Sequence, residues 1–124
     1  MTTVLLIGLA GMCGTLFRYW LTGIAHKLLG ASFPWGTLAA NILGCFLFGV
    51  IFALAEEKFV LGEQTRIVLL VGFMGSFTTF SSLIFESNQL LRDTQWILAG
   101  INYLGQTGLG LMALWLGIIL ARAV

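Results

Sequence analysis

The sequence predicts an all-α integral membrane protein with four transmembrane helices in a single domain, residues 1–124. Composition is the first reason, because 59% of the 124 residues are apolar and 9% are charged, with a mean hydropathy of +1.01. Such values lie well outside the usage of soluble proteins. Length is the second reason, since four apolar stretches each reach the ~20 residues that cross a bilayer. The connections between them are short and leave no room for a soluble domain.

The first two spans are predicted at residues 3–25 and 34–55. No positively charged segment precedes the first, so we expect it to remain as a span rather than to be removed as a signal peptide. Pro34 and Trp35 open the second span, because proline fits the first helical turn and tryptophan favours the membrane interface. A polar connector, residues 56–66, follows.

The third span, residues 66–91, carries the polar run Gly72-Phe-Met-Gly-Ser-Phe-Thr-Thr-Phe-Ser-Ser82 at its centre. Hydroxyl groups at this depth in the membrane are found only in a protein interior or along a water-filled pathway. As one straight helix the ~26 residues would reach ~39 Å, beyond the ~30 Å hydrocarbon core. A steep tilt would accommodate the excess length. We predict instead a helix broken at its centre, near residues 75–80, because discontinuous spans place binding sites at the membrane midplane.

The fourth span is predicted at residues 96–121, with Trp96 and Arg122 at its two interfaces. Small residues four apart let membrane helices approach each other closely. Such pairs occur at Ala10/Gly14, Ala40/Gly44 and Gly72/Ser76.

Positive charges are distributed evenly over the two ends of the predicted bundle. With both termini on one side, that side holds Lys58, Arg66 and Arg122, and the other holds Arg18, Lys27 and Arg92. Equal numbers leave the positive-inside rule without a preferred orientation. Because so short a chain can barely enclose a pathway alone, we expect a symmetric oligomer. An antiparallel, dual-topology homodimer satisfies both observations.

Uncharged hydrogen-bond donors are the candidate lining of a pathway. The pairs are Thr37 with Asn41, Ser81 with Ser82, and Tyr103 with Thr107. Neutral donors attract an anion and still let it leave, as conduction requires. Phe77 and Phe80 add ring edges of positive character. The same polar groups can instead simply bond helices together; we expect that role for Asn102 and Gln106, and for Asn41 both roles stay open.

Composition also excludes several functions. A soluble enzyme does not fit, and His26, expected in a short loop beside Lys27, has no catalytic partners. A net charge of +1 without a basic cluster excludes nucleic acid as a partner. Cys13 and Cys45 lack a CxxC spacing, so we expect buried thiols rather than a disulfide or a metal site.

Only two ionisable side chains lie well inside the predicted spans, and such residues are functional candidates. Arg18 could attract anions into a vestibule. Glu86 is expected to pair with a nearby cation or to face water, because it lies close to a span end.

Three motifs together resemble the bacterial fluoride channel family (Fluc, also called CrcB). They are Gly72-x-x-Gly75-x-x-Thr78-Thr-Phe-Ser81, Gly36-Thr37-x-x-x-Asn41 and Gly11-x-x-Gly-x-x-x-Arg18-Tyr. The resemblance covers the full length of the chain. It implies an antiparallel homodimer in the bacterial inner membrane, with two passive pores that export fluoride and select against chloride. It also implies a structural sodium ion on the two-fold axis, held by the backbone carbonyls of Gly75 and Thr78 from both subunits, a hard cation with oxygen ligands.

By the same resemblance, Asn41 is the pore asparagine, Phe80 the first pore phenylalanine and Arg18 the vestibule arginine, while Ser81 and Ser82 form the hydroxyl pair that follows. The family has a second phenylalanine where this chain has Leu83. Leucine offers an anion no polar edge, so we expect conduction to be slowed or altered at this position.

Two other functions are compatible with a four-span chain. A proton-coupled exporter of the small multidrug resistance type also has four spans, but it needs a carboxylate at the membrane centre, and the first span has none. A non-transporting assembly subunit would leave the central polar run without a role.

Overall fold

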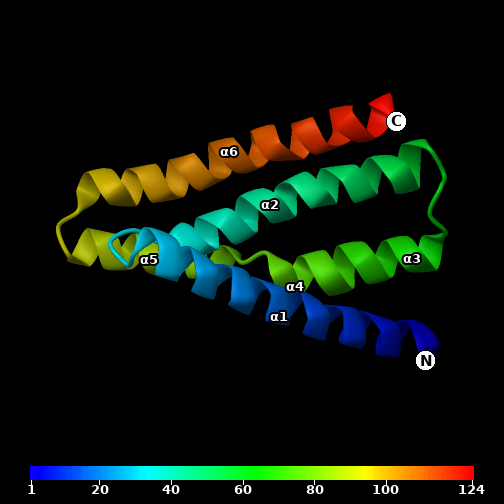
Figure 1. Cartoon of the computed structure of the whole chain (residues 1–124), viewed down its shortest axis with the longest axis horizontal. Coiled ribbons are helices and arrows are strands. Elements are labelled where there is room, and N and C mark those ends of the chain that lie inside the picture. The colour runs from blue at the N-terminus through cyan, green and yellow to red at the C-terminus, as the bar shows by residue number, and fades with distance from the viewer.

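The computed structural model describes residues 1–124, and its regular elements are all helices, with no strand. Four spans are long and apolar enough to cross a membrane: Thr2–Leu29, Trp35–Glu57, Glu63–Arg92 and Trp96–Ala123. The first and last are the continuous helices α1 (Thr2–Leu29) and α6 (Trp96–Ala123). The four-span prediction is thereby confirmed (Figure 1).

The two middle spans are built from several segments. The second consists of α2 (Trp35–Phe52) and the π-helical segment η1 (Ala53–Glu57). The third consists of α3 (Glu63–Ile67), the π-helical segment η2 (Val68–Met74), α4 (Gly75–Phe77) and α5 (Phe80–Arg92). Between α4 and α5, Thr78 and Thr79 have extended backbone.

The predicted end of the first span was too early. Helix α1 continues to Leu29, so His26 and Lys27 lie in its last turn rather than in a loop. The physical reason is that no glycine or proline lies between residue 25 and Gly30, which ends the helix with a φ of 82°, a conformation that favours glycine.

Both termini lie at one end of the bundle, together with the connection between η1 and α3 (Figure 1). Two ion pairs lie at this end. The Arg122 guanidinium donates to both carboxylate oxygens of Glu57, at 2.6 and 2.5 Å, and Arg66 pairs with Glu56. The connections α1–α2 and α5–α6 lie at the opposite end. Both termini therefore lie on one side, as was assumed for the distribution of positive charges (Figure 1).

Glycines set the distances between the helices. A Cβ built at Gly49 of α2 would lie 2.2 Å from the Leu114 carbonyl oxygen, and one at Gly117 of α6 would lie 2.2 Å from the Phe46 carbonyl oxygen. A Cβ at Gly14 of α1 would lie 2.3 Å from the Phe73 carbonyl oxygen. Close packing at the predicted small residues is therefore confirmed at Gly14, and also at Gly44 and Gly72, where a Cβ would lie 2.2 Å from Thr78 Cγ2 and 2.9 Å from Ala10 Cβ. Gly49 and Gly117 form a further close contact that the sequence did not predict.

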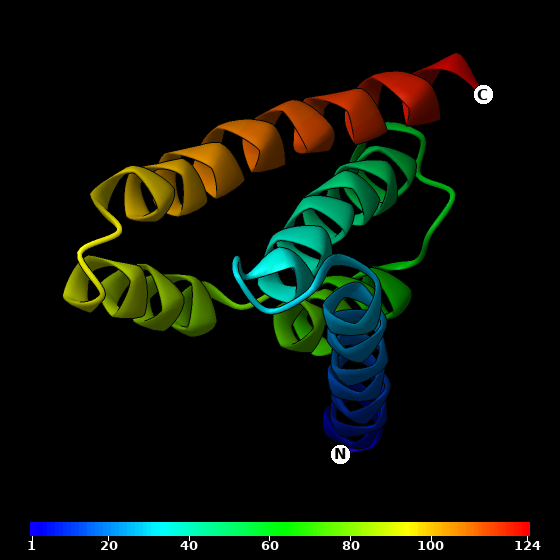
Figure 2. The same ribbon diagram turned by 60° about the vertical axis from the view of Figure 1, so that its left-hand side comes forward.

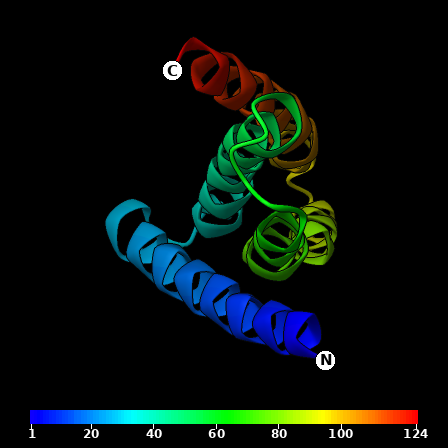
Figure 3. The same ribbon diagram turned by 90° about the vertical axis from the view of Figure 1, so that its right-hand side faces the viewer.

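The two halves of the third span pack against different helices. Segments η2 and α4 lie beside α1, whereas α5 lies beside α6 (Figure 2). Viewed along the bundle, α1 and α6 lie on opposite sides of α2 (Figure 3). The interruption at residues 78–79 is thus the point where the span leaves one neighbour for the other.

Much of the apolar surface remains uncovered in the single chain. Only 6% of the most apolar window of α1 is buried. Cys13 lies on that exposed surface and Cys45 is half-buried, and both thiols are free. The expectation of two buried cysteines was therefore wrong for Cys13, because α1 touches its neighbours along one face only.

Candidate functional site

The site centres on the interruption of the third span. Thr79 has a φ of −150° and a ψ of 111°, so its N–H and C=O point to the same side, as in a β-strand. Both groups bond to the side chain of Asn41. The Thr79 N–H donates to Oδ1 at 2.8 Å, and Nδ2 donates to the Thr79 carbonyl at 3.1 Å. The Asn41 amide thus replaces the strand partner that an extended residue requires.

The Thr79 side chain caps the helix that follows. Its Oγ1 accepts from the Ser82 N–H at 3.3 Å and donates to the Ser82 hydroxyl at 3.0 Å. The Ser81 hydroxyl lies 3.3 Å from the same oxygen. This arrangement satisfies part of the α5 N-terminus, and it places three hydroxyl groups at the positive end of a helix inside the membrane-spanning region.

A string of buried amides continues from Asn41 across α6. Asn41 Nδ2 donates to Gln106 Oε1 at 2.7 Å, Gln106 Nε2 donates to Asn102 Oδ1 at 2.7 Å, and Asn102 Nδ2 donates to the Ser87 hydroxyl at 3.0 Å. Asn102 is fully buried and Gln106 is 4% exposed. The expectation that Asn102 and Gln106 bond helices together is confirmed.

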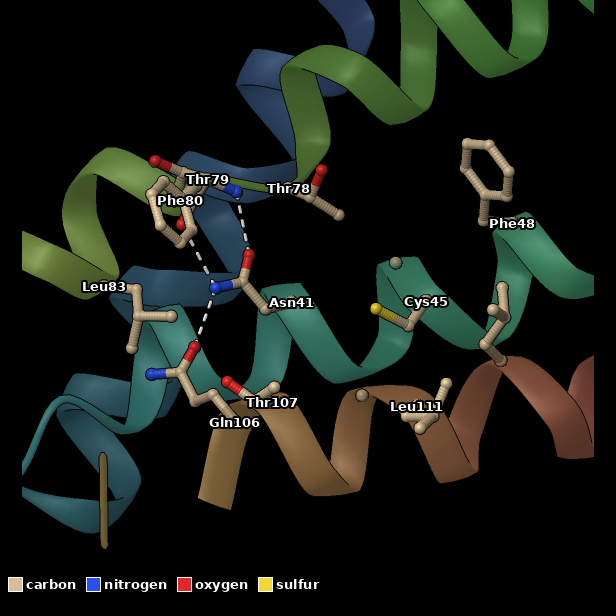
Figure 4. A pocket seen from close by; sticks show the side chains of 13 residues that line it. Asn41, Cys45, Phe48, Thr78, Thr79, Phe80, Leu83, Gln106, Thr107 and Leu111 are labelled. Atoms are coloured by element: carbon tan, nitrogen blue, oxygen red, sulfur yellow. Dashed lines mark hydrogen bonds between the residues drawn. The ribbon is translucent and has the colours of Figure 1, made fainter. Parts of the chain in front are cut away.

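A cavity of about 540 Å³ lies between α2, α6 and the start of α5 (Figure 4). The predicted pathway residues on its wall are Asn41, Phe80, Leu83 and Thr107. Phe80 is 70% exposed, while Leu83 is 6% exposed. The remainder of the wall includes Thr78, Thr79 and Gln106, with apolar residues farther along α2 and α6. The interruption and the amide string therefore meet at one hollow.

Thr37 and Glu86 form a separate contact, nearer the α1–α2 end of the bundle. The Thr37 hydroxyl donates to Glu86 Oε1 at 2.5 Å, and Thr37 is 5% exposed. The other carboxylate oxygen of Glu86 is buried without a protein partner. Glu86 forms no salt bridge, so the first of its two expected roles, pairing with a cation, was wrong. The reason is positional, because a hydroxyl of α2 faces this carboxylate. The other expected role, facing water, is not contradicted, because Glu86 is half-buried and lines a hollow together with His26 and Gln89.

The remaining predicted residues do not line this cavity. Tyr103 lines a second hollow, about 410 Å³, between α5 and α6. The Thr107 hydroxyl donates to the Tyr103 carbonyl of its own helix at 2.8 Å. Ser81 is exposed and Ser82 is half-buried. Arg18 is half-buried on α1, and its Nε has no hydrogen-bond partner.

The interruption also releases two backbone carbonyls. In a continuous helix the Thr79 N–H would bond to the Gly75 carbonyl and the Ser82 N–H to the Thr78 carbonyl. Here Thr79 donates to Asn41 and Ser82 donates to the Thr79 hydroxyl. The carbonyls of Gly75 and Thr78 therefore lose their helical donors. Gly75 is exposed on the surface of the chain.

Comparison with known proteins agrees with the resemblance. The model of the family described as CrcB-like protein, Camphor Resistance (CrcB), matches residues 5–118. The chain belongs to this family. A protein of Nitrosococcus oceani named fluoride-specific ion channel FluC is 52% identical over 95% of this chain and 94% of its own length. Proteins of the same name from Solidesulfovibrio magneticus and Nitratidesulfovibrio vulgaris (strain Miyazaki F) are 51% and 44% identical, over 95% and 100% of this chain and 94% and 100% of their own lengths.

Sequence reasoning missed two parts of this CrcB-like site. Gln106 bonds directly to Asn41, although nothing in a single sequence pairs residues of α2 and α6. The signal that was available is the Asn102/Gln106 spacing, which places both amides on one face of α6. The backbone of Thr79 was also missed, although a threonine that precedes a helix is a common N-cap.

Proposed function

We propose that the protein is a passive, fluoride-selective channel of the bacterial inner membrane, through which fluoride leaves the cell. The observation that carries the proposal is the N-terminus of α5, which meets the cavity inside the membrane-spanning region. Helix N-termini attract anions through their free N–H groups and their dipole. The nearby hydroxyls and amides carry no full charge, so an ion can bind and leave again.

The relatives named fluoride-specific ion channels support fluoride as the ion. Fluoride is small and strongly hydrated, so it requires several strong donors to replace its water. The proton-coupled exporter is not supported, because the Glu86 carboxylate is bonded to Thr37 toward one end of the bundle. The proposed function is passage of an ion rather than catalysis.

The second part of the proposal is an antiparallel homodimer with two pores, in which the interruption of the third span persists in the bilayer. The large apolar surface of α1 and the exposed Phe80 support a further protein contact. Equal positive charge at the two ends supports insertion in both orientations. Lipid covers the rest of the apolar surface.

A structural sodium ion on the dimer axis is the third part. The residues fit a hard cation, because the carbonyls of Gly75 and Thr78 have lost their helical donors and Gly75 is exposed where a second chain can approach. Oxygen ligands suit sodium, and the C-terminal end of a helix is electronegative. When bound, the ion would hold the two interruptions together.

The dimer and its ion are tested together on purified protein. In sodium buffer we expect light scattering to give twice the mass of one 13.5 kDa chain. The melting temperature should fall when N-methyl-D-glucamine replaces sodium. A mass equal to one chain would overturn the proposed dimer. A melting temperature that does not change without sodium would overturn the proposed sodium site. A C-terminal tag that reagents reach from only one side of the membrane would overturn the antiparallel arrangement.

The channel itself is tested by ion efflux from potassium-loaded liposomes that contain the purified protein and valinomycin. Fluoride is expected to leave rapidly after valinomycin is added, while chloride stays inside. Protein-free liposomes are the control for leakage. If a monodisperse protein shows no fluoride efflux, the channel proposal is rejected and a non-transporting subunit is favoured.

A further inference from the structure

The amide of Asn41 has only one orientation that satisfies its surroundings. The Thr79 N–H can only donate and the Thr79 carbonyl can only accept. Asn41 must therefore turn Oδ1 to the N–H, at 2.8 Å, and Nδ2 to the carbonyl, at 3.1 Å. A rotated amide would place donor against donor and acceptor against acceptor at the same two contacts.

That orientation determines every later bond in the string. The second N–H of Asn41 requires an acceptor, and Gln106 presents Oε1 at 2.7 Å. The nitrogen of Gln106 then faces Asn102 Oδ1, at 2.7 Å, and Asn102 donates onward to the Ser87 hydroxyl at 3.0 Å. Ser87 closes the string because a hydroxyl can accept or donate. Both N–H groups of Asn41 are thus used within the protein.

Gln106 is the member of the string that acts on Asn41. It is 4% exposed and the next residue of the string, Asn102, is fully buried, so water cannot easily take the place of its oxygen. The close α2–α6 contact at Gly49 and Gly117 leaves no space for a Cβ. Helix α6 therefore holds Gln106 at a fixed distance from α2. Figure 4 shows Gln106 reaching from α6 toward the Asn41 amide beside Leu83.

We propose that Gln106 is a positioning residue for anion passage. By accepting from Asn41 Nδ2 it holds the amide in the orientation that keeps Thr79 extended and the α5 N-terminus turned to the cavity. This inference rests on the proposed channel function. Without the Gln106 acceptor, one N–H of Asn41 is left unpaired in a half-buried site, and this cost weakens the hold of the amide on the Thr79 backbone.

The test compares three variants in the liposome assay and by calorimetry. Gln106→Met keeps the length of the side chain and removes the acceptor for Asn41. Asn102→Leu removes two hydrogen bonds from the same string but leaves the Gln106–Asn41 bond. Gln64→Met repeats the first substitution at an exposed glutamine that bonds only to Thr3, at the other end of the bundle. We expect Gln106→Met to lower fluoride efflux about tenfold and Gln64→Met to leave it unchanged.

The decisive comparison is between Gln106→Met and Asn102→Leu. Both should lower the melting temperature to a similar extent, because each removes two buried hydrogen bonds. If Gln106 positions the Asn41 amide, only Gln106→Met should strongly lower fluoride efflux. Efflux losses that simply follow the melting temperatures would overturn the positioning role and leave Gln106 as a packing residue.

A readout that does not depend on flux separates this inference from the channel proposal. In protein labelled with ¹⁵N at asparagine, the side-chain amide signals of Asn41 should move in Gln106→Met and stay in place in Asn102→Leu. Signals of Asn41 that do not respond to Gln106→Met would overturn the inference even if the wild-type protein conducts. If the wild-type protein shows no fluoride efflux but the Asn41 amide signals move as expected, the channel proposal is rejected and the hydrogen-bonded orientation of Asn41 is retained.

Discussion

Replacing Asn41 with leucine is expected to lower fluoride efflux by more than about tenfold, the largest effect of any single substitution proposed for this protein. Leucine matches the shape of asparagine but removes three hydrogen bonds, two to the Thr79 backbone and one to Gln106. An unpaired buried N–H or C=O costs about 1–3 kcal/mol. The extended backbone at Thr79 then has no partner, and the N-terminus of α5 loses its defined position at the cavity.

The measurement is efflux from liposomes, normalised to the amount of folded protein reconstituted. Asn88→Leu is the matched control, since Asn88 is exposed on α5 and makes no side-chain hydrogen bond. Full efflux from Asn41→Leu would show that the interruption does not depend on this amide. A protein that cannot be purified as a monodisperse species would identify the contact as one that folding itself requires.

Substitution of Leu83 by phenylalanine is expected to raise fluoride efflux by roughly three- to tenfold. Leu83 lies on the cavity wall with Phe80, and its side chain is 6% exposed. A ring edge of positive character would attract the anion, and an attraction as large as that of an aromatic pair, about 0.5–1.5 kcal/mol, corresponds to this change. The cavity of about 540 Å³ gives the larger side chain space to enter.

Leu83→Met separates the effect of the ring from the effect of size, because methionine fills space without an aromatic edge. We expect its efflux to stay near that of the wild type. If Leu83→Phe conducts no faster than the wild type, leucine is not what limits passage here. A gain in both variants would point to packing of the cavity wall rather than to the ring.

The paired amides show where prediction from the sequence stopped. The spacing of Asn102 and Gln106 was enough to expect hydrogen bonds between helices, and the structure contains them. For Asn41 the sequence left two roles open. The structure adds that both of its N–H groups bond to the protein. No pattern along one chain could show this, because the partners lie on a different helix and on an extended residue.

The Glu86 carboxylate and the Cys13 thiol show the same limit. Both were assigned from position within a span, but Glu86 bonds to Thr37 instead of to a cation, and Cys13 is exposed instead of buried. Position along a span reports depth in the membrane, but it does not report which face of the helix meets a neighbour.

Composition and spacing along the chain were enough to place the four spans, their short connections and the polar run within the third. Insertion of a helix into a bilayer depends on the total hydrophobicity of about 20 consecutive residues, so length and composition suffice to locate a span. Which donor meets which acceptor, which carbonyls the interruption releases and where the cavity lies became visible only in the packed helices. A hydrogen bond needs its partners within about 3 Å and correctly oriented, and that condition depends on how the helices pack.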